Sequence, residues 1–202
     1  MNKKQVLVIH GGTAFPSHEE YLAFLEDSQP ELERMKARTD WKLGLQGKLG
    51  GGFDVFQPRM PNGADARYDE WKMWFEKVAP LLEDEIILVG HSLGGVFLAK
   101  YLSENIFPKK IRAVVLISAP FDDEGSDESL YSFAPGDSLE KFKTQTDKIV
   151  LYHSEDDPVV PFAQVKKYKE RLPLADLHIF TDRGHFNQEE FPELIDILRS
   201  LA

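Results

Sequence analysis

Six short apolar runs, each rich in β-branched residues, recur along the 202-residue chain and constrain its fold more than any other feature. Runs of this length and composition predict buried strands. They occupy residues 6–9, 53–56, 86–89, 113–117, 149–152 and 177–180. Segments with helical apolar spacing separate them. The alternation predicts an α/β fold, with about six mostly parallel strands, helices on both faces of the sheet, and a functional site where the strands end.

One domain, residues 1–202, is expected to account for the whole chain. Its length and its 42% share of hydrophobic residues suffice for one sizeable core, and no repeat or Pro/Gly-rich linker divides it. No separate cap domain is expected. The clearest helix is the last, for which Asn187 is the expected cap, Glu190 follows three residues on, and Pro192 falls in the first turn.

Residues 14–52 are long for one crossover connection and are predicted to be an insertion near the functional site that holds two helices. Ser17 and Glu20 form a capping-box pattern at the start of the first helix. The glycine run at 50–52 precedes a strand, and no Gly-Lys-Ser/Thr follows it, so a phosphate-binding loop is not expected there.

Charge and residue usage exclude several classes of function. A net charge of −10 disfavours nucleic acids and anionic membrane surfaces as partners. The chain has no cysteine, which removes disulfides, thiolate metal sites and thiol catalysis. The apolar run after Lys3 and Lys4 is too short for a signal peptide, and no run reaches transmembrane length. We therefore expect a cytoplasmic protein.

Residues 90–94, Gly-His-Ser-Leu-Gly, match the pattern G-x-S-x-G between a predicted strand and a predicted apolar helix. In that setting the serine lies on a strained turn with its hydroxyl exposed, and glycines flank it because side chains there would collide. The alternative is a chance match, which the strand–turn–helix context argues against. The motif predicts Ser92 as a nucleophile.

A serine hydroxyl needs a base to take its proton, and His185 is the best placed of six histidines for this role. It follows the last predicted strand, on a loop before the final helix. His153, at the end of the fifth strand, is the alternative. The other four lie in turns, in the early segment or within a strand: His10, His18, His91 and His178.

Asp157 is predicted to accept the second N–H of the histidine and hold it in the useful tautomer. It follows the fifth strand on a short loop, and Pro161 suits the first turn of the next helix. Alone, Asp157 would be interpreted as a turn or cap residue. Together, Ser92, Asp157 and His185 follow the chain order of the α/β-hydrolase arrangement.

An oxyanion formed by attack on a carbonyl needs two preorganised N–H donors. Leu93, directly after the nucleophile, is expected to supply one. Gly12, in the turn after the first strand, is the preferred second donor, and Thr13 is the alternative. The competing interpretation of these glycines is a simple turn.

Three segments resemble the α/β-hydrolase superfamily and, within it, the small serine hydrolase family of retinoblastoma-binding protein nine and the YdeN-type esterases. They are residues 90–92 with the preceding strand, residues 154–158, and residues 182–186 running into 191–195. The likeness extends from about Trp41 to the carboxyl terminus. It implies a core without the first two strands of the full fold, no metal or other cofactor, and hydrolysis of small esters or amides.

The sequence thus predicts a carboxylesterase-like serine hydrolase that cleaves small esters or amides through an acyl-enzyme on Ser92. Two alternatives stay open. An acyltransferase or thioesterase would use the same three residues, and a protein-binding module would retain the hydrolase fold without catalysis.

Two segments are expected to modify the site. Residues 14–40 look longer than the corresponding loop of the family and are expected to roof the pocket in part. An acidic stretch after the fourth strand is either a solvated loop or favours substrates with an ammonium group. Its members are Asp122, Asp123, Glu124, Asp127 and Glu128.

Overall fold

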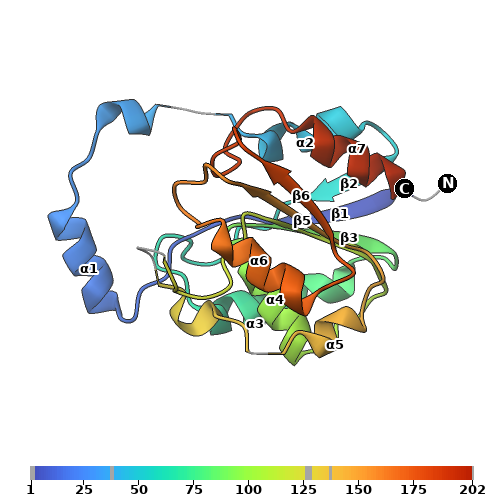
Figure 1. Cartoon of the computed structure of the whole chain (residues 1–202), viewed down its shortest axis with the longest axis horizontal. Coiled ribbons are helices and arrows are strands. Elements are labelled where there is room, and N and C mark those ends of the chain that lie inside the picture. Colours follow the sequence, from blue (N-terminus) through green and yellow to red (C-terminus); the bar gives the residue numbers. More distant parts are fainter. Residues whose placement is uncertain (1–2, 37–38, 126–128, 137, 202) are drawn as a thin grey trace.

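The computed structural model describes residues 3–36, 39–125, 129–136 and 138–201, and it contains one six-stranded sheet between two layers of helices (Figure 1). The strand order is β2-β1-β3-β4-β5-β6, and all five neighbouring pairs are parallel. The predicted α/β-hydrolase fold is confirmed. The strands are β1 (Lys4–Ile9), β2 (Phe53–Phe56), β3 (Ile86–His91), β4 (Ile111–Ile117), β5 (Ile149–Ser154) and β6 (Asp176–Phe180).

Helices cover both faces of the sheet, with α2 and α7 on one side and α3, α4, α5 and α6 on the other (Figure 1). The α-helices are α1 (His18–Asp27), α2 (Trp41–Leu49), α3 (Tyr68–Val78), α4 (Leu93–Glu104), α5 (Glu140–Lys143), α6 (Ala163–Arg171) and α7 (Pro192–Ser200). The described residues also form three short 3-10 turns, η1 (Leu32–Met35), η2 (Ala79–Leu81) and η3 (Tyr131–Phe133).

The central strands are buried on both faces because successive side chains point to opposite sides of the sheet. In β3, Ile86 and Leu88 join the core under α3 and α4, whereas Ile87 and Val89 join the core under α2 and α7. Burying each such side chain contributes about 1.5–3 kcal/mol. The sheet is therefore a rigid platform for the loops at its carboxyl edge, where the strands end.

The two edge strands correct the expectation that all six runs are buried. In β6, all five residues are exposed or partly exposed, and only Phe53 of β2 is buried. Each edge strand has a neighbouring strand on one side only, so its residues are less covered than those of the central strands. The apolar composition of a run does not by itself distinguish an edge strand from a central one.

The predicted cap of the last helix is wrong. Phe191, not Asn187, precedes its first turn, and Pro192 opens it as expected. The main-chain oxygen of Gln188 accepts a hydrogen bond from the N–H of Trp41, and Glu190 pairs with Lys48. These contacts hold residues 188–190 as a loop. Helix α6 likewise begins later than predicted, at Ala163.

Residues 14–52 hold the two predicted helices, α1 and α2, together with η1. Ser17 caps α1 by accepting a hydrogen bond from the N–H of Glu20 at 3.3 Å. Helix α1 buries none of its residues and stands apart from the sheet (Figure 1). Asp40 caps α2 through two N–H groups of its first turn.

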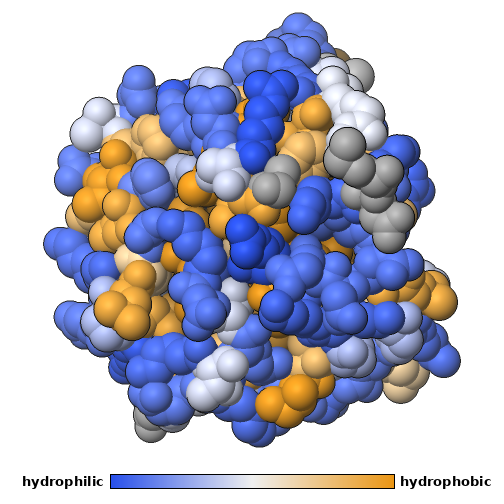
Figure 2. Space-filling model, turned by 90° about the vertical axis from the view of Figure 1, so that its right-hand side faces the viewer, coloured by the Kyte–Doolittle hydropathy of each residue, from blue (hydrophilic) through white to orange (hydrophobic). Residues whose placement is uncertain are grey.

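The surface near the two termini is mostly hydrophilic, with separate hydrophobic patches (Figure 2). Within the described residues, no helix combines the length and the apolar character that a bilayer crossing requires. The location of the protein in the cytoplasm stays a prediction.

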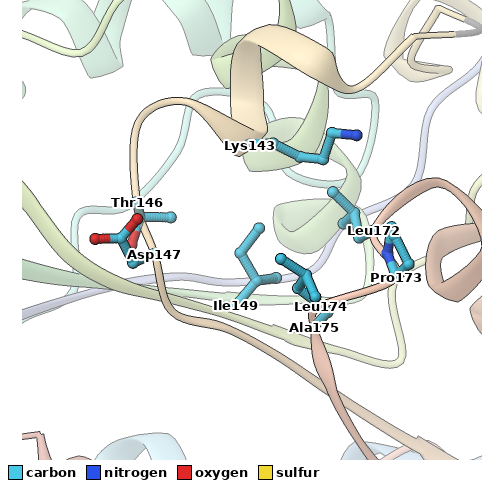
Figure 3. Close-up of a pocket in the computed structure, with 8 residues that line it drawn as sticks. All are labelled: Lys143, Thr146, Asp147, Ile149, Leu172, Pro173, Leu174 and Ala175. Carbon is cyan, nitrogen blue, oxygen red and sulfur yellow. The ribbon is translucent and has the colours of Figure 1, made fainter.

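An apolar cavity of about 290 Å³ opens at the amino ends of β5 and β6 (Figure 3). It is lined by Lys143, Thr146, Asp147, Ile149, Leu172, Pro173, Leu174 and Ala175. Ile149 is the first residue of β5, so this cavity lies at the opposite edge of the sheet from Ser92 and contains none of the predicted catalytic residues.

Candidate active site

Ser92 lies on the sharp turn between β3 and α4, in a strained backbone conformation. Its φ is 54° and its ψ is −125°, a region that residues other than glycine rarely adopt. Such a conformation costs about 1–3 kcal/mol and persists only where the surroundings enforce it. Here the N–H of Ser92 donates to the oxygen of Ile117, and its own oxygen accepts from Gly95. The turn predicted from the sequence motif is present.

The glycines beside Ser92 allow α4 to approach the sheet closely. A Cβ on Gly90 would lie 2.5 Å from the oxygen of Gly94, and one on Gly94 would lie 2.3 Å from the oxygen of Ile9. Both distances are below contact distance to backbone atoms that cannot move aside. The motif therefore reflects steric necessity on both sides of the serine.

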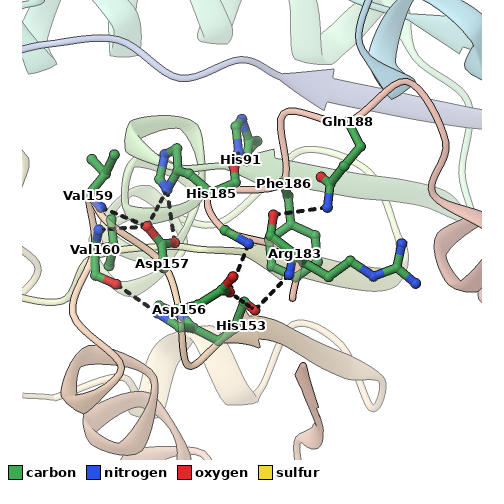
Figure 4. Close-up of polar contacts among 12 residues, drawn as sticks. His91, His153, Asp156, Asp157, Val159, Val160, Arg183, His185, Phe186 and Gln188 are labelled. Carbon is green, nitrogen blue, oxygen red and sulfur yellow. Dashed lines mark hydrogen bonds and ion pairs between the residues drawn. The ribbon is translucent and has the colours of Figure 1, made fainter. Parts of the chain in front are cut away.

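Asp157 and His185 form a hydrogen-bonded pair (Figure 4). Nδ1 of His185 lies 3.0 and 2.9 Å from the two carboxylate oxygens. Because a carboxylate only accepts, Nδ1 carries the proton, and Nε2 of the neutral ring is left as a base. The N–H groups of Val159 and Val160 donate to the same carboxylate at 2.9 and 3.0 Å.

These contacts keep Asp157 ionised. Burial raises the pKa of this fully buried carboxyl, but the hydrogen bond from His185 and the two N–H groups outweigh burial and lower the pKa below that of an ordinary aspartate. The carboxylate can therefore orient His185 and stabilise its charged form.

One open cavity of about 350 Å³ contains both Ser92 and His185. It is lined by His10, Gly11, Gly12, Thr13, Lys42, His91, Ser92, Val159, His185 and Asn187. Asp157 does not line this cavity, but its carboxylate bonds to His185, which does. The structure thus brings together the three residues predicted from the sequence, although they are separated by 65 and 28 positions (157 − 92 and 185 − 157).

His153, the alternative base, lies outside this cavity. It is fully buried, and its Nε2 donates to the oxygen of Val160 at 2.9 Å. Burial lowers the pKa of His153. The residue supports the loop that carries Asp157.

Gly12 and Leu93 are both placed to supply oxyanion donors. Leu93 is the first residue of α4, so its N–H has no acceptor within the helix. Gly12 lines the cavity, and a Cβ there would lie 2.6 Å from the oxygen of Gly63. The N–H of Thr13 donates to that oxygen of Gly63 at 2.9 Å. Because this donor is occupied, the geometry favours Gly12 over Thr13.

His91, which was predicted only to lie in a turn, lines the cavity. It is the last residue of β3, it is buried, and its Nε2 donates to the main-chain oxygen of His185 at 2.8 Å. Burial, followed by the nearby charge of Lys42, holds the pKa of His91 well below that of an ordinary histidine. Its position beside the nucleophile in the motif was the only signal in the sequence.

Asp156 has a role separate from that of Asp157. It accepts hydrogen bonds from the hydroxyl of Ser154 and from the N–H of Gly184 (Figure 4). The Ser154 bond is the main reason that the pKa of Asp156 is lowered. Asp156 therefore ties the loop of β5 to the loop that carries His185.

The described residues of the acidic stretch do not line the cavity. Asp122 and Glu124 pair with Lys167 at 2.7 and 2.6 Å, and Asp123 accepts from Ser129. Asp127 and Glu128 lie outside the described residues.

The expectation that residues 14–40 roof the pocket is not met either. Among their described members, only Ala14 contributes, and it lines an adjoining cleft.

Known serine hydrolases resemble this chain in sequence. The sequence pattern of the family described as "Serine hydrolase" matches residues 35–199. The serine hydrolase RBBP9 of Rattus norvegicus is 32% identical over 152 residues, which is 74% of this chain and 78% of that protein. The putative hydrolase YdeN of Bacillus subtilis (strain 168) is 25% identical over 173 residues, covering 83% of this chain and 90% of that protein.

Solved structures share the fold. The ydeN gene product from B. subtilis superimposes with a TM-score of 0.72 at 22% identity, covering 98% of both chains. A meta-cleavage product hydrolase from Pseudomonas fluorescens IP01 gives a TM-score of 0.62 at 17% identity, covering 99% of this chain and 90% of that one. With the family pattern matching most of the chain, the protein belongs to the serine hydrolase family and is a hydrolase of the α/β-hydrolase fold.

Proposed function

We propose that this protein hydrolyses small carboxylic esters or amides through an acyl-enzyme on Ser92. The observation that carries the proposal is the Asp157–His185 pair, which opens into the same cavity as the strained Ser92. A carboxylate-oriented histidine in the same cavity as a half-buried serine is the arrangement that acyl transfer requires.

In the first half-reaction, Oγ of Ser92 attacks the carbonyl carbon while Nε2 of His185 takes the hydroxyl proton. The N–H groups of Leu93 and Gly12 stabilise the negative charge that forms on the carbonyl oxygen. Collapse of this intermediate breaks the bond to the leaving group, which takes the proton from His185. The alcohol or amine departs, and the acyl group stays on Ser92.

In the second half-reaction, water attacks the acyl-enzyme and His185 again acts as the base. The products are the carboxylic acid and the free Ser92 hydroxyl. An acceptor alcohol, amine or thiol in place of water would make the protein an acyltransferase. Product analysis with added acceptors distinguishes the two reactions.

A fluorophosphonate probe tests the proposal. We expect one adduct, located on Ser92 by mass spectrometry, and hydrolysis of p-nitrophenyl acetate. Ser92→Ala is expected to abolish labelling and to lower kcat by on the order of a million-fold.

Ser103→Ala is the matched control, because Ser103 lies on α4 and bonds to the oxygen of Ala99. It should label and turn over normally. If the wild-type protein formed no adduct, or if Ser92→Ala hydrolysed the ester at the same rate, the proposal would be wrong and a non-catalytic binding module would be the better interpretation.

A further inference from the structure

Two pockets that differ in the polarity of their lining both include Ser92. One is a cleft of about 20 Å³, lined mainly by apolar side chains. Its lining consists of Gly12, Ala14, Ser92, Leu93, Pro120, Ser129, Leu130, Val159 and Val160. The other is the larger cavity of about 350 Å³, in which polar side chains prevail.

The proposed reaction decides which compartment takes which part of a substrate. His185 must protonate the leaving group, and His185 lines the larger cavity but not the apolar cleft. The leaving group therefore occupies the larger cavity. The acyl group then occupies the apolar cleft on the other side of Ser92.

Lys42 places a cation in the leaving-group cavity. Its side chain is only 13% exposed, and it lines the same cavity as Ser92 and His185. Its Nζ lies 2.7 Å from Oδ2 of Asp40 and 3.5 Å from Nδ1 of His91. An ammonium group has three N–H donors. Two of them bond to Asp40 and His91, and Nζ also lies 4.8 Å from the centre of the Trp41 ring. The third N–H has no hydrogen-bond acceptor among the described residues, so it remains a donor for a ligand.

The counter-ion of Lys42 lies away from the cavity. Asp40 caps α2 through Oδ1, holds Lys42 through Oδ2, and is not part of the cavity lining. Asp157 is engaged by His185. The positive end of the Asp40–Lys42 pair therefore faces the substrate, and no described carboxylate lines the cavity to oppose it.

Two further polar side chains surround the same space. Thr13 and Asn187 line the cavity, and neither side chain has a hydrogen-bond partner among the described residues. A hydroxyl, a primary amide and an ammonium can all donate hydrogen bonds, and donors around one space suit an acceptor with several lone pairs.

We infer that the natural substrate has a leaving group bearing a carboxylate, and that Lys42 binds this carboxylate and sets the specificity of the reaction. The chemical class is a short-chain acyl ester or amide of a hydroxy or amino acid. The inference rests on the proposed function, because the position of the leaving group follows from the role of His185.

Two acetate esters with matched leaving groups test the inference. They are 4-acetoxyphenylacetate and its neutral amide, 4-acetoxyphenylacetamide, in which a methylene separates the charged or neutral group from the phenol. We expect kcat/KM to favour the carboxylate by about tenfold or more, the usual value of one charge-assisted hydrogen bond.

Variants of Lys42 locate the source of the preference. Lys42→Met is expected to lower the carboxylate-to-amide ratio of kcat/KM by about tenfold, mainly through KM, whereas Lys42→Arg should retain most of the ratio. Lys48→Met is the control. Lys48 lies near the other end of the same helix and pairs with Glu190, so its loss should leave the ratio unchanged.

The outcomes are distinct. Equal turnover of both esters by the wild type would overturn the inference and leave the proposed function intact. An equal loss for both esters in Lys42→Met would mean that Lys42 only supports His91. Faster turnover of the cationic ester (4-acetoxybenzyl)trimethylammonium would also overturn the inference, in favour of an acidic subsite. No turnover of any ester, with no fluorophosphonate labelling, would refute the proposed function itself.

Discussion

His91 donates a hydrogen bond of 2.8 Å from Nε2 to the main-chain oxygen of His185, and the centres of the two rings lie 5.0 Å apart. The donor comes from the strand that leads into Ser92, and the acceptor belongs to the loop that carries the proposed base. This bond therefore links the positions of the proposed nucleophile and the proposed base. We expect His91 to act as a positioning residue, since the proposed catalytic atoms belong to Ser92 and His185.

His91→Phe is expected to lower kcat by about 10- to 100-fold, because a small displacement of His185 spoils proton transfer. His91→Gln retains a side-chain N–H donor and should recover part of the loss. KM should change little in either variant. A kcat equal to that of the wild type in His91→Phe, with the fold verified by circular dichroism, would contradict this role.

Asp157→Asn is expected to lower kcat by about 10⁴-fold, because an amide presents its N–H to His185 and stabilises the wrong tautomer. Asp156→Asn is the neighbouring control. Asp156 contacts Ser154 and Gly184 but not His185, so its loss should cost less than tenfold. Steady-state kinetics of the two variants make the comparison, and similar losses in both would argue against the assignment of Asp157.

Folding stability is expected to decline as the pH falls below about 6.5. Burial lowers the pKa of both His91 and His153 in the folded protein. Below pH ~6.5 the unfolded chain therefore binds protons that the folded chain does not, and each histidine removes at most about 1.4 kcal/mol per pH unit down to its folded pKa.

Urea denaturation between pH 5.5 and 7.5 measures this slope. His91→Gln should flatten it, because one of the two titrating groups is gone. Equal slopes for His91→Gln and the wild type would show that His91 does not contribute.

Gly94→Ala and Gly47→Ala are expected to change stability in opposite directions. The Cβ at position 94 would lie 2.3 Å from the oxygen of Ile9, so α4 would have to move from the sheet at a cost of about 1–3 kcal/mol. At position 47, within α2, a Cβ would meet nothing within 4 Å. There alanine should stabilise by about 0.5–1 kcal/mol through helix propensity. Chemical denaturation compares the two, and destabilisation by Gly47→Ala would contradict the argument.

Acetyl esters are expected to exceed butyryl esters in kcat/KM by about tenfold or more. A cleft of about 20 Å³ accommodates roughly one water-sized group beyond the carbonyl. Leu130→Ala removes a side chain from the cleft and should improve the relative turnover of p-nitrophenyl butyrate. A butyrate preference in the wild type would show that the acyl group lies elsewhere.

Much of the fold was predictable because its signals are local. A buried central strand such as β3 needs a continuous apolar run, and a strand–turn–helix around Ser92 needs glycines at fixed spacing. Ser92, Asp157 and His185 each follow a predicted strand, which predicted that all three lie at the carboxyl edge. These predictions needed only the periodicity of strands and helices and the rule that parallel strands end at one edge.

The sequence by itself determined the class of fold, the strained serine turn and the three residues proposed to act there. The tertiary structure decided which runs form exposed edges, and it showed that the N–H of Thr13 is occupied by Gly63. It also brought Lys42 to His91, although 49 positions separate them. Such contacts depend on how α2 packs over the sheet, and no local pattern encodes a meeting between two distant side chains.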